Sequence, residues 1–167
     1  MANKTYESAF GNTYEALQCL TWTVLYYHFD FDKDKLIKFQ RQLAINDGII
    51  DNKNLYIKTY EKLRDEYKTD CIRLTNSFPY ISKIKMAGIN TKKVKGMKDG
   101  LAGCNNAMEV YFVILFNELF GTWNMNKEDA EMFYEKLKEN AELYRKGMKN
   151  EFVKKYFKDE IDLEIFL

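Results

Sequence analysis

The sequence predicts an all-α fold, in a single domain of about six helices that covers residues 1–167. Apolar residues recur at intervals of three and four, which is the spacing of one face of a helix. The chain contains one proline and eight glycines, and it lacks the alternation of apolar and polar residues that is typical of strands. Its length allows one domain to bury a core without a disulfide or a metal ion.

The first half of the chain is expected to form three helices. Asn12 or Thr13 is expected to cap the first helix, whose apolar stripe predicts a largely buried element. Gly48 is a stop signal for the second helix, and Pro79 ends the third because the residue before a proline avoids helical backbone angles. The three ranges run from near Tyr14 to His28, from about Asp32 to Asn46 and from about Asn54 to Asn76.

The second half is expected to contain the remaining helices. After a short turn or helix at residues 80–88, Thr91 is expected to cap a helix that continues into the apolar segment at residues 107–120. Asn126 is expected to cap the next helix. The last two helices are expected from Lys127 to about Lys146 and from about Asn150 to Lys158, with an apolar tail after them.

Residues 11–67 and 103–161 share the order of their features. Each segment has an aromatic-rich helix, a polar turn and a second helix, and from Phe39 and Phe133 onward the two run at a constant offset of 94 residues. Either the chain contains an internal duplication, or one Lys-, Phe- and Leu-rich composition has produced two similar helix pairs. A duplication predicts two helical hairpins with pseudo-two-fold symmetry and no deep cleft, which favours a binding protein over an enzyme.

The residues that most catalytic and metal sites require are scarce. His28 is the one histidine, and the three cysteines are too far apart for a zinc site, so we expect no metal, no cofactor and no enzymatic activity. The alternating aspartates of DFDKDK (residues 30–35) resemble the start of a calcium loop, but Lys35 and Arg41 occupy the positions that need glycine and glutamate. We therefore interpret these aspartates as favourable charges at a helix N-terminus.

The scattered cysteines and the absence of an apolar leader at the N-terminus predict a cytoplasmic protein in a reducing compartment. The longest apolar runs are far shorter than the ~20 residues that span a bilayer, so we expect no membrane contact.

A lysine-rich segment is the main candidate binding site. Residues 83–103 contain six lysines against one acid, Asp99, and such a segment can contact phosphates or an acidic protein surface. The alternative is an ordinary solvated lysine surface. The segment's glycines predict either a smooth helix face or a flexible loop, and that choice decides whether the lysines form a stripe or an arm. The six lysines are Lys83, Lys85, Lys92, Lys93, Lys95 and Lys98, and the glycines are Gly96, Gly100 and Gly103.

Aromatic residues make up 16% of the chain, and most of them are expected in the core. Trp123, in the turn before Lys127, and the terminal residues 165–167 (IFL) are candidates for exposed anchors at an interface, unless they fold back onto the core.

Two segments, VLYYHFDFDKDKLIKF and VILFNELFGTWNMNKEDAEMF, resemble the hydrophobic helix, aromatic turn and Lys/Phe-bearing helix of small accessory proteins of phages and conjugative elements of low-GC Gram-positive bacteria. The resemblance covers about half of the chain and transfers no functional residue. It implies a mobile-element protein that acts on host machinery. Non-enzymatic proteins of this type include anti-CRISPR inhibitors, which bind a nuclease effector and block DNA access or cleavage.

We therefore expect a non-enzymatic interaction protein of a phage or mobile element that binds and inhibits a host defence nucleoprotein, such as a CRISPR effector nuclease. The alternative is a DNA- or RNA-binding accessory protein that uses the same lysines on phosphates. A third hypothesis is a small enzyme with a carboxylate site built from the chain's many acidic residues. The sequence specifies no oligomeric state.

Overall fold

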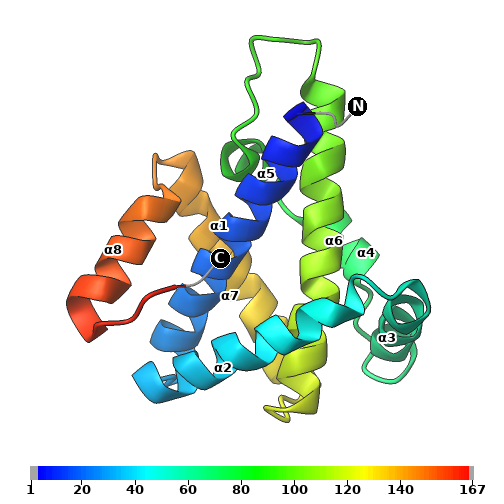
Figure 1. The fold of residues 1–167 in the computed structure, drawn as a ribbon, viewed down its shortest axis with the longest axis vertical. Helices are drawn as coiled ribbons and strands as arrows, with labels where there is room; N and C mark the ends of the chain where they lie inside the picture. Colours follow the sequence, from blue (N-terminus) through cyan, green and yellow to red (C-terminus); the bar gives the residue numbers. More distant parts are fainter. Residues whose placement is uncertain (1–3, 166–167) are drawn as a thin grey trace.

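The computed structural model describes residues 4–165, and the secondary structure of this part of the chain consists of helices joined by loops, with no strand (Figure 1). The prediction of an all-α fold is confirmed. The described residues form eight α-helices rather than about six, together with one short 3₁₀ turn, η1. The elements are α1 (Lys4–His28), α2 (Lys33–Asn46), η1 (Asp47–Ile49), α3 (Lys53–Asp65), α4 (Cys71–Ser77), α5 (Tyr80–Ala87), α6 (Met97–Gly121), α7 (Lys127–Arg145) and α8 (Asn150–Ile161).

The two longest helices, α1 and α6, form the centre of the molecule and pack on each other more extensively than any other pair. They approach closely at Gly103, where a Cβ atom would overlap the backbone carbonyl of Tyr6. Further along the same interface, the Tyr111 hydroxyl is hydrogen-bonded to the Thr21 hydroxyl at 2.7 Å, and both residues are fully buried. The close packing that the glycines suggested therefore occurs at Gly103.

Helix α1 begins ten residues earlier than the sequence predicted, so the expected caps at Asn12 and Thr13 are wrong. Asn12 instead donates a hydrogen bond from its side-chain amide to the carbonyl of Ala87 at 3.1 Å, and Thr13 is completely buried. Both residues therefore lie within α1, and neither has the capping role that its residue type favours.

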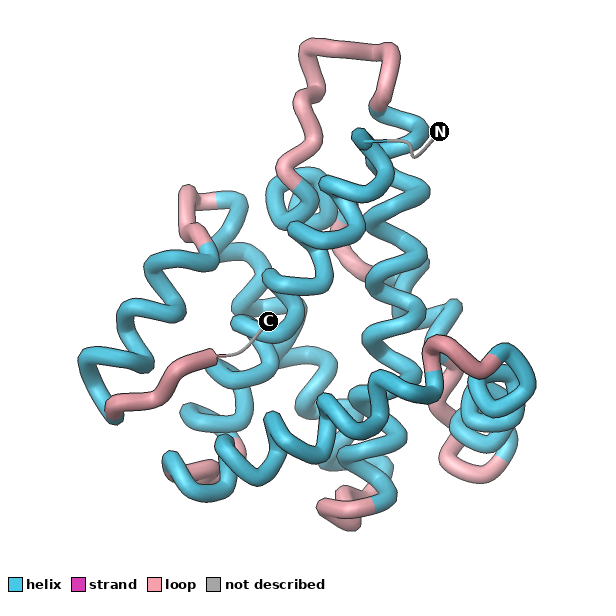
Figure 2. The backbone as a smooth tube through the Cα atoms, in the orientation of Figure 1, coloured by secondary structure: helices cyan, strands magenta, loops and turns pink. Residues whose placement is uncertain are grey.

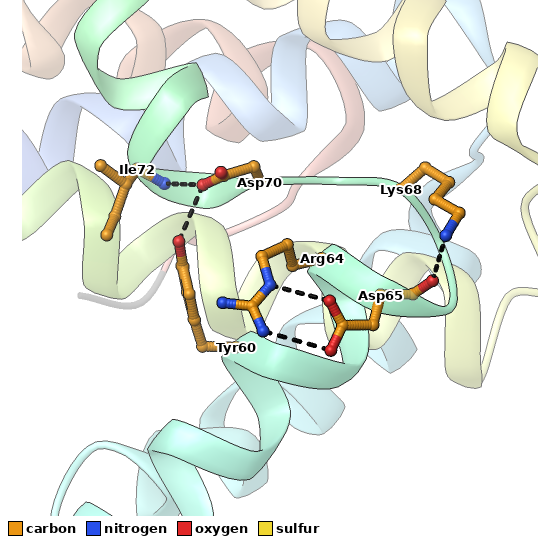
Figure 3. Close-up of polar contacts among 6 residues, drawn as sticks. All are labelled: Tyr60, Arg64, Asp65, Lys68, Asp70 and Ile72. Carbon is orange, nitrogen blue, oxygen red and sulfur yellow. Dashed lines mark hydrogen bonds and ion pairs between the residues drawn. The ribbon is translucent and has the colours of Figure 1, made fainter.

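The long third helix of the prediction is divided into α3 and α4 (Figure 3). Lys68 has a left-handed backbone (φ 54°), and the Thr69 amide closes the end of α3 on the carbonyl of Leu63 at 2.8 Å. Asp70 then caps α4 by accepting hydrogen bonds from the amides of Ile72 and Arg73. The prediction of one helix failed because the apolar spacing continues across a break made by local capping.

The Asp70 carboxylate also accepts a hydrogen bond from the Tyr60 hydroxyl at 2.8 Å, and this bond ties α3 to α4. Figure 3 also shows the exposed pair of Arg64 and Asp65 at the end of α3, near this turn. As predicted, the segment ends before Pro79, which stands at the start of α5.

Thr91 does not cap a helix, and this prediction was also wrong. Residues 89–96 form a loop, and α6 begins at Met97 after Gly96, whose φ of 112° few other residues adopt. Each of the two structures predicted for the glycine-containing segment therefore applies to a part of it. Residues 92–96 lie in the loop, and residues 97–103 lie in α6.

The remaining helices pack around the central pair. Helices α2 and α3 pack on α6, whereas α7 and α8 pack on α1. Neither α2 nor α7 makes its main contacts with the helix that precedes it, so the two expected hairpins are not confirmed. The common helix order of residues 11–67 and 103–161 is compatible with a duplication, which stays a prediction.

The helices at the C-terminal end follow the prediction more closely. Asn126 caps α7 by accepting a hydrogen bond from the Asp129 amide at 2.8 Å. Helix α8 continues to Ile161, and the tail after it returns to the core, where Leu163 and Ile165 are buried. Phe166 and Leu167, the rest of the expected IFL anchor, lie outside the described residues. None of the described helices combines the length and apolar character needed to cross a bilayer.

Candidate interaction surface

The loop at residues 89–96, here called the basic loop, projects from the helical body between α5 and α6 and is the topmost pink segment in Figure 2. Its first residue, Ile89, packs on α6 at Gly100, where a Cβ would lie 2.9 Å from the isoleucine side chain. The Asn90 side chain accepts a hydrogen bond from the Lys92 amide at 3.0 Å. The Met97 amide donates to the carbonyl of Val94 and connects the far end of the loop to α6. The basic loop is therefore held by contacts at both ends and within its turn.

Three of the predicted lysines, Lys92, Lys93 and Lys95, are exposed on the basic loop. Within residues 4–165 none of the three forms an ion pair, whereas helices α1, α2, α7 and α8 all carry such pairs. Val94, between these lysines, is 85% exposed. An apolar side chain with this exposure, surrounded by unpaired positive charges, favours contact with an acidic surface.

A cavity of about 300 Å³ lies between the basic loop and the start of α1. Lys4, Lys93 and Lys95 line it together with the hydroxyl-bearing Ser8 and the amide-bearing Asn90, and its described lining contains no acid. Lysines and neutral hydrogen-bonding groups form an environment that attracts anions. The cavity could hold a carboxylate or a phosphate group of a partner.

Two further predicted lysines lie near the basic loop. Lys85 is exposed in the last turn of α5, and Lys98 is exposed in the first turn of α6. Asp99 is the one acid of this segment, so both lysines extend the positive surface of the loop over the adjacent helix ends.

Lys83 does not belong to this surface. It is only 7% exposed, on the buried side of α5, and its backbone carbonyl accepts a hydrogen bond from the Cys104 thiol at 3.7 Å. Burial lowers the pKa of its ammonium group. Sequence spacing alone did not show that this residue lies on the side of the short helix that faces the core.

Trp123 lies at the other end of α6, roughly 35 Å from the basic loop by the length of that helix. Its ring is half-buried, with the Phe31 centroid at 4.6 Å and the Phe39 centroid at 6.2 Å. The Lys38 ammonium lies over the ring at 5.4 Å. The structure therefore does not bring Trp123 together with the lysines, and its ring packs with α2 and the turn before it.

The side chains that commonly ligate metal ions do not form a cluster in the described part of the chain. Residues 4–165 contain no group of three or more histidine, cysteine or acidic side chains that could hold a metal ion. Asp32, from the calcium-like run, caps α2 by accepting the Lys35 amide at 2.9 Å, as expected for a helix N-terminus.

Sequence reasoning missed Lys4, Ser8 and Asn90 as residues of the surface. Lys4 and Ser8 were placed before the first helix, so nothing connected them with the lysine-rich segment. An i, i+3, i+4 reading of residues 6–14 could have extended α1 and brought its first turn into the prediction.

In comparisons with known proteins, no protein-family model, curated protein or solved structure matches the chain.

Proposed function

We propose that this chain is a non-enzymatic binding protein of a phage or mobile element, which inhibits a host defence nucleoprotein in the cytoplasm of a bacterial cell. The most concrete target is an RNA-guided CRISPR nuclease. The observation that supports binding is the basic loop, whose Lys92, Lys93 and Lys95 are exposed and carry no ion pair with the described residues. The phage source and the target class rest on the sequence resemblance.

The composition of the basic loop favours a protein surface as the first contact. Val94 offers an apolar centre, and the surrounding lysines offer a charged rim, which is the usual arrangement at a protein interface. The chain contains four arginines, and none lies in the loop, so bidentate recognition of bases or phosphates is absent from it. The protein partner is expected to present an acidic patch with an apolar depression.

Affinity capture from a low-GC Gram-positive lysate tests this proposal. The bait is the tagged protein, with nuclease treatment in parallel. A loop variant, Lys92→Glu with Lys93→Glu and Lys95→Glu, is expected to lose a stoichiometric, nuclease-resistant partner that the wild type retains. The matched control carries the same charge change at exposed lysines far from the loop, at Lys53, Lys58 and Lys146, and is expected to retain the partner. Equal capture by both variants would exclude the basic loop as the contact surface.

The cavity beside the loop supports a second candidate function, which is contact with the phosphates of DNA or RNA. Three lysines and a serine hydroxyl surround a space large enough for a phosphate group. Three phosphate contacts predict that the logarithm of affinity falls with the logarithm of salt concentration with a slope of about −2 to −3. Binding of an oligonucleotide with that slope, and recovery of nucleic acid alone from the lysate, would favour this function over the first.

A further inference from the structure

A second cavity lies between the C-terminal half of α1, the end of α7 and α8. Its volume is about 480 Å³, and no residue of the basic loop lines it. This volume lies within the range of small-molecule sites in proteins. Helix α8 forms one wall of the cavity and buries a single residue, Phe157. The apolar part of the lining includes Leu20, Leu143, Met148, Val153, Tyr156 and Phe157.

The lining of this cavity includes His28 but carries no lysine, arginine, aspartate or glutamate, although these four residue types make up 31% of the chain. The lysines of α8 are engaged elsewhere: Lys154 pairs with Glu15 on α1 at 2.5 Å, and Lys155 pairs with Asp159 at 2.5 Å. A charged ligand would lose its hydration in this cavity without gaining a counter-charge. The charge pattern therefore favours an uncharged ligand.

Two of the tyrosine hydroxyls at the cavity already donate hydrogen bonds within the protein. The Tyr144 hydroxyl donates to the side-chain oxygen of Asn150, and the Tyr27 hydroxyl donates to the hydroxyl of Tyr156. Tyr27 and Tyr144 consequently offer mainly ring faces and edges to a ligand, whereas the Tyr156 hydroxyl, which accepts the bond from Tyr27, can still donate one hydrogen bond. Aromatic rings are good partners for such surfaces because offset and edge-to-face contacts add to the gain from burial.

We infer that this cavity is a binding site for an uncharged, mainly apolar small molecule that contains an aromatic ring. Leu20 and Leu143 supply aliphatic walls, and the tyrosines and Phe157 supply the aromatic ones. The site is separate from the basic loop, so the inference does not depend on the proposed function.

Titration with Nile red, a neutral planar dye, tests the inference directly. The expected result is a saturable fluorescence increase with one dye per chain, together with a rise in Tm of a few degrees at saturation. The affinity is expected to stay unchanged between 50 mM and 500 mM salt, because no charge contributes to binding. The Debye length falls over this range from about 14 Å to about 4 Å, so an electrostatic contribution would be weakened. The anionic dye anilinonaphthalene sulfonate is expected to bind at least tenfold more weakly.

Two variants fill the cavity from different helices, which guards against the misfolding of either. Val153→Phe on α8 and Leu143→Trp on α7 are each expected to weaken Nile red binding at least tenfold, with helix content and cooperative unfolding retained. Phe152→Ser is the matched control, since Phe152 is 56% exposed beside Val153 but does not line the cavity. This variant is expected to bind as the wild type does.

Three results would overturn the inference. The first is the absence of saturable Nile red binding to the wild type. The second is wild-type affinity in both filled variants or loss of binding in Phe152→Ser, which would place the dye on exposed surface. The third is a dye capacity that falls as the protein concentration rises, which would assign this face to a second copy of the chain.

Discussion

Gly103 of α6 lies against the backbone carbonyl of Tyr6 of α1, so closely that no side chain fits between the two helices. Gly103→Ala is expected to separate the central helices and to lower the free energy of unfolding by about 3 kcal/mol, since overpacking of a rigid backbone has no easy relief. Urea unfolding measures this change. Gly11→Ala is the control, because Gly11 lies in α1 with open space around it. That variant is expected to stabilise the protein by about 0.5 to 1 kcal/mol. Similar stability of the two variants would contradict the close contact.

Glu118, on α6, is 3% exposed and accepts a hydrogen bond from the Asn46 side-chain amide at 2.5 Å. Burial raises the pKa of its carboxyl above the usual 4.5, although the bonds from Thr122 and Asn46 act in the opposite direction. The folded protein thus holds this proton at a pH where the unfolded chain has released it. This group's contribution to stability is present at low pH and falls as the pH rises from about 4.5 through the raised pKa.

Glu118→Gln is expected to remove this part of the pH dependence while retaining a polar partner for Asn46. The measurement is the free energy of unfolding between pH 4.5 and pH 8 for the wild type and the variant. Glu109→Gln removes a carboxylate from the same helix without touching the contact between Glu118 and Asn46, and it serves as the matched control. A Glu118→Gln profile parallel to that of the wild type would show that the buried carboxyl does not titrate in this range.

Asp70→Ala removes both the cap of α4 and the acceptor for the Tyr60 hydroxyl. Loss of a helix cap costs about 1 kcal/mol, and loss of the second bond adds to this. The Tm is expected to fall by several degrees, and hydrogen exchange is expected to rise first in α4. Asp65→Ala breaks an exposed pair with Arg64 on the same turn and should leave the Tm unchanged. A larger loss in Asp65→Ala would mean that Asp70 is not what holds the turn.

The variant Lys83→Met distinguishes the contribution of the buried Lys83 to partner binding from that of the exposed lysines. Methionine fills a similar space without a charge, so the variant is expected to fold with equal or greater stability. Capture of the partner is expected to be unchanged, because Lys83 is only 7% exposed, whereas Lys92, Lys93 and Lys95 are exposed on the basic loop. Loss of the partner in a folded Lys83→Met protein would show that Lys83 belongs to the contact after all.

The sequence predicted the elements whose signals are local. The start of α7 at Asn126 and the break before Pro79 follow from side-chain capping and from backbone sterics, and both were found where expected. The start of α1 was missed because Asn12 contacts Ala87, which is 75 residues away in the chain. A pattern in one sequence does not contain such a contact. The pairing of α1 with α6 was hidden for the same reason.

The candidate surface was predictable in part. The exposed lysines of the basic loop follow from a charged, glycine-containing segment, which rarely packs in a core. The burial of Lys83 and the packing of Trp123 depend on how α5 and the turn after α6 sit on neighbouring helices. The sequence therefore predicted where positive charge is concentrated along the chain, but it did not predict which of the candidate side chains lie together on the protein surface.

The anchoring of the basic loop at Ile89 and Asn90 has a consequence for the energetics of recognition. Ordering a flexible segment costs about 1 to 2 kcal/mol of backbone entropy for each residue, and here that loss occurs when the chain folds. A partner that binds the basic loop would meet a preorganised surface, so the favourable energy of each contact would not be reduced by a disorder-to-order transition. Substitutions of Ile89 and Asn90 by other uncharged residues would leave the net charge of the basic loop unchanged. They would nevertheless weaken association, because they would loosen the loop that carries the lysines.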